Sequence, residues 1–92
     1  MIVTTEEAKT YLRVDFADED ALVEHFLNTA QQLCMSIARY DDEDTFMEEC
    51  KAAKIAILYA TGYLYEHREE ADHHALTLTL RSLLFGTRKE AF

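Results

Sequence analysis

The 92-residue chain contains no proline and only two glycines, and this shortage of helix-breaking residues constrains its fold more than any other feature. Proline removes a backbone donor and clashes with the preceding helical turn, while glycine lowers helix stability. The chain is also 49% apolar, and its apolar residues recur mainly at helical spacing. The sequence therefore predicts an all-α fold, a small bundle of about four helices with a long, central third helix, and we expect one domain over residues 1–92.

The first helix is predicted directly after Thr4. Glu7 stands three residues further on, which is the spacing of a capping box, in which each residue's side chain bonds the other's backbone N–H. Ala8, Tyr11 and Leu12 then fall on one face of about two helical turns.

A second helix is expected from about residue 18 to residue 39. Its first turn carries the acidic run Asp18-Glu19-Asp20, and negative charge is favourable at a helix N-terminus. One apolar stripe follows it, with further apolar residues alongside. The stripe is Leu22, Phe26, Ala30, Leu33 and Ile37, flanked by Val23, Leu27 and Cys34.

The third helix is expected over about residues 45–68, after the acidic run at residues 41–44, with Asp44 or Thr45 as its N-cap. One apolar row repeats at spacings of four and three, and a second row lies beside it, so we expect neighbours on more than one side. The first row is Phe46, Cys50, Ala53, Ile57, Ala60 and Leu64, and the second is Ala52, Ala56, Tyr59 and Tyr63.

The segment LTLTL at residues 76–80 alternates as a strand does, but Leu76, Leu80 and Leu84 also fit a helix. No other segment offers a partner strand, so a fourth helix is the better prediction. Gly86 is placed to end it, and we expect a flexible tail over residues 87–92.

The formal net charge is −9, and the charge is unevenly placed. Residues 1–50 carry 13 acidic and three basic side chains, whereas residues 51–92 carry five and six. An acidic balance disfavours nonspecific DNA binding, because Lys and Arg make most phosphate contacts. The asymmetry fits either a solvated acidic face or two unlike surfaces suited to head-to-tail association. A transmembrane span is not expected, nor a signal peptide, because Glu6 and Glu7 stand where it would be basic.

Residues with metal or catalytic chemistry are present, but not at the spacing that such chemistry needs. The Cys and His residues lack zinc-site spacing, the acidic run at 41–44 lacks the glycine and glutamate of a calcium loop, and there is no phosphate-binding glycine loop. Cys34 and Cys50 are expected to be buried, reduced thiols. We therefore expect no catalytic, cofactor or metal site.

Two alternative functions remain open at this point. An acidic helical protein can act as an inhibitor that mimics DNA. All-α magnesium pyrophosphohydrolases use EExxE and ExxD carboxylates, for which Glu48, Glu49, Glu69 and Asp72 are candidates. The third carboxylate of that pattern is replaced by Ala52, which weakens a hard-cation site.

Three blocks of the chain together resemble the small head–tail connector proteins of tailed bacteriophages and prophages. The first block is TEEAK at residues 5–9 and YLRVD at residues 11–15, followed by Asp18, Asp20, Ala21, Leu22 and Val23. The second is ATGYLYEHRE at residues 60–69, and the third is LRSLL at residues 80–84, followed by Arg88. The chain departs from that family's pattern by having no proline before the third helix or near the final Leu-Leu, which bears on loop geometry more than on the fold.

The resemblance implies a structural, non-enzymatic adaptor that forms a homo-oligomeric ring of about a dozen copies. Such a ring would join a portal protein to a tail-completion protein and let DNA pass without specific binding. It would assemble in the host cytoplasm and then lie at the head–tail junction of the virion. The candidate interface residues are Tyr63, Tyr65, Arg68, Phe85, Arg88 and Phe92.

Overall fold

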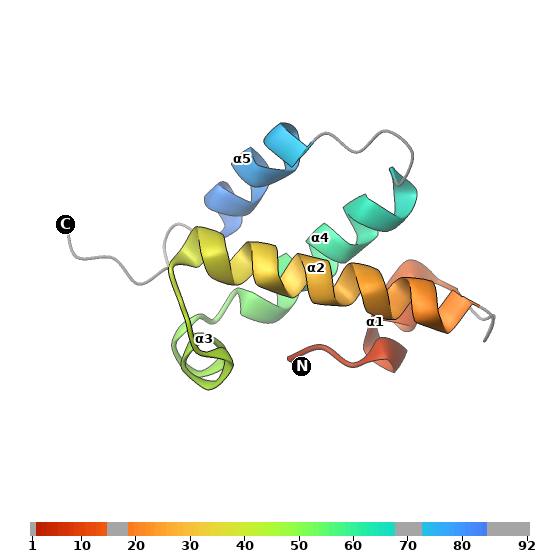
Figure 1. Ribbon diagram of the computed structural model, residues 1–92, viewed down its shortest axis with the longest axis horizontal. Coiled ribbons are helices and arrows are strands. Elements are labelled where there is room, and N and C mark those ends of the chain that lie inside the picture. Colours follow the sequence, from red (N-terminus) through yellow and green to blue (C-terminus); the bar gives the residue numbers. More distant parts are fainter. Residues whose placement is uncertain (1, 15–18, 68–72, 85–92) are drawn as a thin grey trace.

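The computed structural model describes residues 2–14, 19–67 and 73–84. These residues form five α-helices and no strand. The helices are α1 (Thr5–Leu12), α2 (Asp20–Ala38), α3 (Glu43–Glu49), α4 (Ala53–Glu66) and α5 (His73–Leu84) (Figure 1). The prediction of an all-α fold is confirmed, although there are five helices and not four. None of the helices in the described ranges is long and apolar enough to cross a membrane.

The LTLTL segment is helical, as predicted. It lies within α5, where Leu76, Leu80 and Leu84 are fully buried. These leucines are four residues apart and so share one face of the helix, while Leu78 points outward and is 51% exposed. His73 and His74 begin this helix.

The predicted third helix is wrong as a single element, because residues 50–52 interrupt it. Cys50 adopts an extended backbone conformation, with φ −102° and ψ 103°, and the N–H of Ala53 then donates to the Cys50 carbonyl at 3.1 Å as α4 begins. All six residues of the predicted first row are nevertheless buried. The sequence pattern thus identified the core-facing residues but missed the change of direction between α3 and α4.

The longest helix, α2, is central to the fold, and α4, the second part of the predicted third helix, contacts each of the other four helices. Helix α2 contacts α1, α4 and α5, and in Figure 1 it runs along the long axis with α5 above it and α1 and α3 below. The predicted stripe lies at the edge of its contact face, since Leu22, Phe26, Leu33 and Ile37 are only half-buried. The fully buried residues are Ala30 of the stripe, the predicted flanking residues Val23, Leu27 and Cys34, and Ala38.

Both α1 and α2 end at an arginine in the left-handed conformation. Arg13 has φ 62° and Arg39 has φ 66°. In each case the following N–H reaches back to a carbonyl of the last turn, from Val14 to Lys9 and from Tyr40 to Met35, at 2.9 Å. This is the Schellman pattern that glycine usually supplies, so the ends of both helices are fixed without glycine.

The buried side chain of Gln31 joins the N-terminal segment, α2 and α3. Its Oε1 accepts from the Ile2 N–H at 3.1 Å, and its Nε2 donates to Glu43 Oε1 at 2.7 Å. Gln31 is only 4% exposed, so satisfying both ends of its amide avoids a desolvation cost.

The N-cap of α3 is Asp42, not Asp44 or Thr45. The Asp42 carboxylate accepts from the Thr45 N–H at 2.8 Å and from its hydroxyl at 2.7 Å. These hydrogen bonds hold the pKa of Asp42 below its usual value. Within the acidic run, Asp42 therefore has a capping role.

Candidate assembly interface

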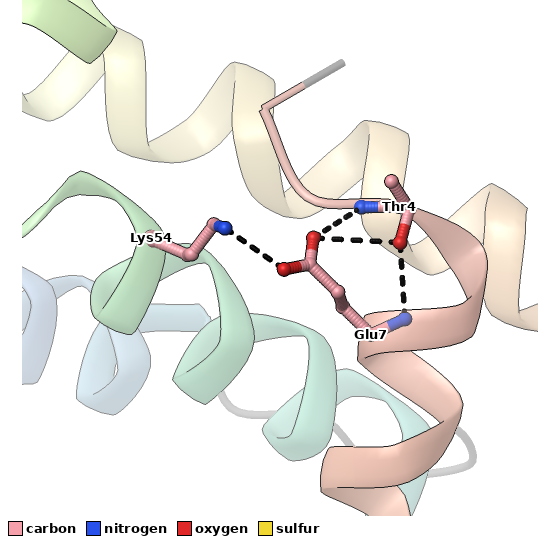
Figure 2. A network of polar contacts seen from close by, with 3 residues as sticks. All are labelled: Thr4, Glu7 and Lys54. Atoms are coloured by element: carbon pink, nitrogen blue, oxygen red, sulfur yellow. Dashed lines mark hydrogen bonds and ion pairs between the residues drawn. The ribbon is translucent and has the colours of Figure 1, made fainter.

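The junction of α1 and α4 is fixed by one carboxylate, that of Glu7 (Figure 2). The Thr4 N–H donates to Glu7 Oε1 at 3.0 Å and the Glu7 N–H donates to Thr4 Oγ1 at 3.1 Å, which confirms the predicted capping box. The other carboxylate oxygen accepts from Lys54 Nζ at 2.8 Å. Lys54, together with the cap, lowers the pKa of Glu7. A local helix cap thus also ties α1 to α4.

A second ion pair joins α1 to α2. Lys9 Nζ lies 2.6 Å from Asp20 Oδ1, and the Lys9 side chain is largely buried. Since α1 has only eight residues, too few for a stable isolated helix, these contacts with α2 and α4 hold it in place.

The C-terminal parts of α1 and α4 enclose a groove of about 500 Å³, which we call the α1–α4 groove. Its lining is aromatic on both sides and charged at the rim. The lining residues are Tyr11, Leu12, Arg13, Tyr59, Gly62, Tyr63, Glu66 and His67.

Gly62 allows the Tyr11 ring to lie close to the α4 backbone in this groove. A Cβ atom at position 62 would lie 3.2 Å from Cε2 of Tyr11 and 3.5 Å from Cδ2 of Leu12. Tyr11 is 50% exposed and Tyr59 is 36% exposed, so two tyrosines present ring surface to solvent here.

The far end of the groove is formed by Tyr63 and His67, one turn apart on α4. Their rings stack with centroids 4.3 Å apart and an interplanar angle of 19°, and His67 Nδ1 lies 3.0 Å from the Tyr63 carbonyl oxygen. The stack holds both rings in a fixed orientation at the end of α4.

The predicted interface residues that the structure describes do not share one surface. Tyr63 lines the α1–α4 groove. Tyr65 faces α2, where its ring meets Phe26 edge-on at 6.4 Å and its hydroxyl donates to the Glu19 carboxylate. Residues two apart on a helix point to different sides, which explains the separation. Arg68, Phe85, Arg88 and Phe92 lie outside the described residues.

The sequence analysis placed Tyr11 and Tyr59 on apolar helix faces and did not identify a groove between them. The available signal was the series Tyr59, Gly62 and Tyr63, which repeats at helical spacing. Its partner surface on α1 depends on how two segments about 50 residues apart come together, which periodicity does not reveal.

The outer face of α4 is also apolar. Ile55 is 64% exposed and, with Tyr59, extends the apolar surface along the helix. A helix that is apolar all round is typically covered by neighbours on every side. Within the subunit α4 contacts α1, α2, α3 and α5, but the side chains of Ile55 and Tyr59 stay exposed. This exposed apolar pair has the character of a binding surface.

Among the described residues, no three His, Cys, Asp or Glu side chains are grouped so that they could hold a metal ion. Cys34 and Cys50 are buried, reduced thiols, as predicted, and burial raises the pKa of the Cys34 thiol to about 12.

The comparison with known families decides the identity of the chain. The family of phage gp6-like head-tail connector proteins matches residues 2–91, which is nearly the whole chain. The chain belongs to this family. The predicted connector identity and the structural, non-enzymatic role are thereby confirmed. No curated protein and no solved structure matches the connector at the threshold applied.

Proposed function

We propose that the connector assembles into a closed ring of about a dozen copies, placed between a portal protein and a tail-completion protein. Membership of the connector family over residues 2–91 carries this proposal. In the infected cell the ring would form in the host cytoplasm and then remain at the head–tail junction of the virion.

The shape and charge of the subunit support association between unlike surfaces. The acidic residues are concentrated in the first half of the chain, and the second half has nearly balanced charge. Contacts between two different patches form head-to-tail, and such contacts close into a ring when the rotation between copies permits. The exposed apolar surface of Tyr11, Ile55 and Tyr59 supplies one such patch.

We assign the predicted interface residues to this assembly with different roles. Tyr63 belongs to the α1–α4 groove, whereas Tyr65 holds α2 and α4 together within the subunit. Arg68, Phe85, Arg88 and Phe92 remain candidates for contacts with other copies or with the portal protein.

The charge of the connector suits a passage through which DNA must move. A ring with a net charge of −9 per subunit repels phosphate groups and lacks the basic surface that holds DNA. DNA would therefore pass without specific binding.

Light scattering over a concentration series, combined with negative-stain electron microscopy, tests this function. We expect annular particles whose fraction rises with protein concentration, because ring assembly follows mass action. The purified portal protein should bind the rings. A connector that stays monomeric at high concentration, with and without the portal protein, would contradict the proposal.

A further inference from the structure

The α1–α4 groove lies at the opposite end of the subunit from the end of α5. In Figure 1 the last turn of α4 lies on the side of the α2 N-terminus, whereas the last turn of α5, ending at Leu84, lies by the α2 C-terminus. The last described turn of α5 and the groove thus lie at different ends of the subunit. A contact between residues 85–92 of one subunit and the groove of another joins opposite ends of the two subunits. A head-to-tail ring requires this arrangement.

The sequence of residues 85–92 complements the groove. It reads FGTRKEAF, with an aromatic ring at each end and two basic residues between them. The groove offers tyrosine rings along its walls and both Glu66 and Arg13 at its rim. Aromatic rings pair favourably edge to face, and basic side chains are attracted both to a carboxylate and to tyrosine faces.

The segment is long enough for this contact. Eight residues in extended conformation span about 26–29 Å, whereas the whole of α4, with 14 residues, is about 21 Å long. The segment is therefore longer than α4 and can run along the groove of a neighbouring copy whose groove lies beside the end of α5.

We propose that the α1–α4 groove binds residues 85–92 of a neighbouring copy, with a phenylalanine of that segment between Tyr11 and Tyr59 and its basic pair beside Glu66. This inference rests on the proposed ring. Every subunit then donates one segment and receives another. Each interface combines a contact between the folded parts of two subunits with the binding of residues 85–92.

Photo-crosslinking in the full chain tests which surface receives the segment. Phe92 is replaced by p-benzoylphenylalanine, and this protein is mixed with heavy-isotope-labelled wild type under ring-forming conditions. We expect crosslinks from the unlabelled variant to isotope-labelled wild-type peptides that contain Tyr11 or Tyr59. The matched control is Leu78→p-benzoylphenylalanine, an exposed position on α5, which should not label those peptides.

The outcomes separate this inference from the proposed function. The groove assignment is overturned if rings form but position 92 crosslinks within its own chain, to another surface of a neighbouring copy, or only to added portal protein. The proposal of a ring would still stand in that case. The absence of any ring would overturn both.

Side-chain variants provide a second readout. Tyr59→Ala should weaken ring assembly by about tenfold or more, as loss of an aromatic anchor does, while Met47→Ala, 60% exposed on α3, should not. Glu66→Lys, and separately Arg88→Glu with Lys89→Glu, should each weaken assembly, and combining them should restore part of it. Circular dichroism verifies that each variant is folded. Unchanged assembly in Tyr59→Ala and Glu66→Lys would contradict the proposal.

Discussion

Gly62 is the residue at which α4 leaves room for the Tyr11 ring. An alanine there would bring its Cβ within 3.2 Å of Tyr11 Cε2, but this ring is half exposed and can move by a few tenths of an ångström. Alanine also stabilises a helix relative to glycine by up to about 1 kcal/mol. We expect Gly62→Ala to raise the free energy of unfolding, as measured by urea denaturation. A clear loss of stability would mean that Tyr11 is held rigidly in the groove.

Two acidic side chains make stability depend on pH. Hydrogen bonds from Lys54 and Thr45 lower the folded-state pKa of Glu7 and Asp42 below their ordinary values of 4.5 and 3.8. Carboxylates of this kind stabilise the fold above the unfolded-state pKa and lose that contribution as pH falls through the folded-state pKa. Unfolding titrations should show stability decreasing below about pH 4.5.

The variant Glu7→Gln tests this assignment. It should be less stable than wild type at neutral pH and approach it in acid, because the wild type then loses the same charge. Lys54→Met should likewise reduce the pH dependence. A variant that differs equally from wild type at every pH would contradict the role of the Glu7 charge.

The Cys34 thiol should be chemically inert in the folded protein. Its pKa of about 12 leaves almost no thiolate at neutral pH, and the thiolate is the reactive form. A thiol-specific reagent at about pH 8 should leave Cys34 unmodified in native protein and modify it in urea, as followed by mass spectrometry. Rapid modification under native conditions would contradict its burial.

At the scale of elements, α3 buries one side chain, that of Phe46. It has seven residues, too few to be stable alone, and its Phe46 is fully buried with its ring 5.3 Å from that of Tyr40. Phe46→Ala should lower the free energy of unfolding by about 3–5 kcal/mol, as measured by urea denaturation. Phe46→Leu should lose less. Met47→Ala, exposed on the same helix, should change it by less than about 0.5 kcal/mol.

The helices also show what the spacing of apolar residues can and cannot predict. The row from Phe46 to Leu64 was correctly predicted as core, because apolar spacing reports which face is buried. The break at residues 50–52 carries no glycine or proline, and Ala52 and Ala53 favour a helix. The packing of Phe46 beside Tyr40 and the hydrogen bonds of Gln31 to Glu43 and of the Tyr40 hydroxyl to Glu49 hold α3 in its separate direction.

At the scale of the whole molecule, the net charge of −9 predicts how the connector meets DNA. Electrophoretic mobility assays at about 0.15 M salt should show no retention of duplex DNA by the connector, whether monomeric or assembled, because few phosphates can be neutralised. Retention that weakens steeply with added salt would indicate a basic surface created on assembly and would contradict the proposed passage.

The sequence by itself determined the all-α class, the capping box at Thr4, the core row from Phe46 to Leu64 and the connector family. These depend on neighbours in sequence, on the spacing of apolar residues and on family blocks that can be read along the chain. Only the tertiary structure decided that α2 is central, that the third helix is divided, and that Tyr11 and Tyr59 line one groove. These features depend on contacts between residues far apart in the chain, which compete with local preference and override it where burial contributes more free energy.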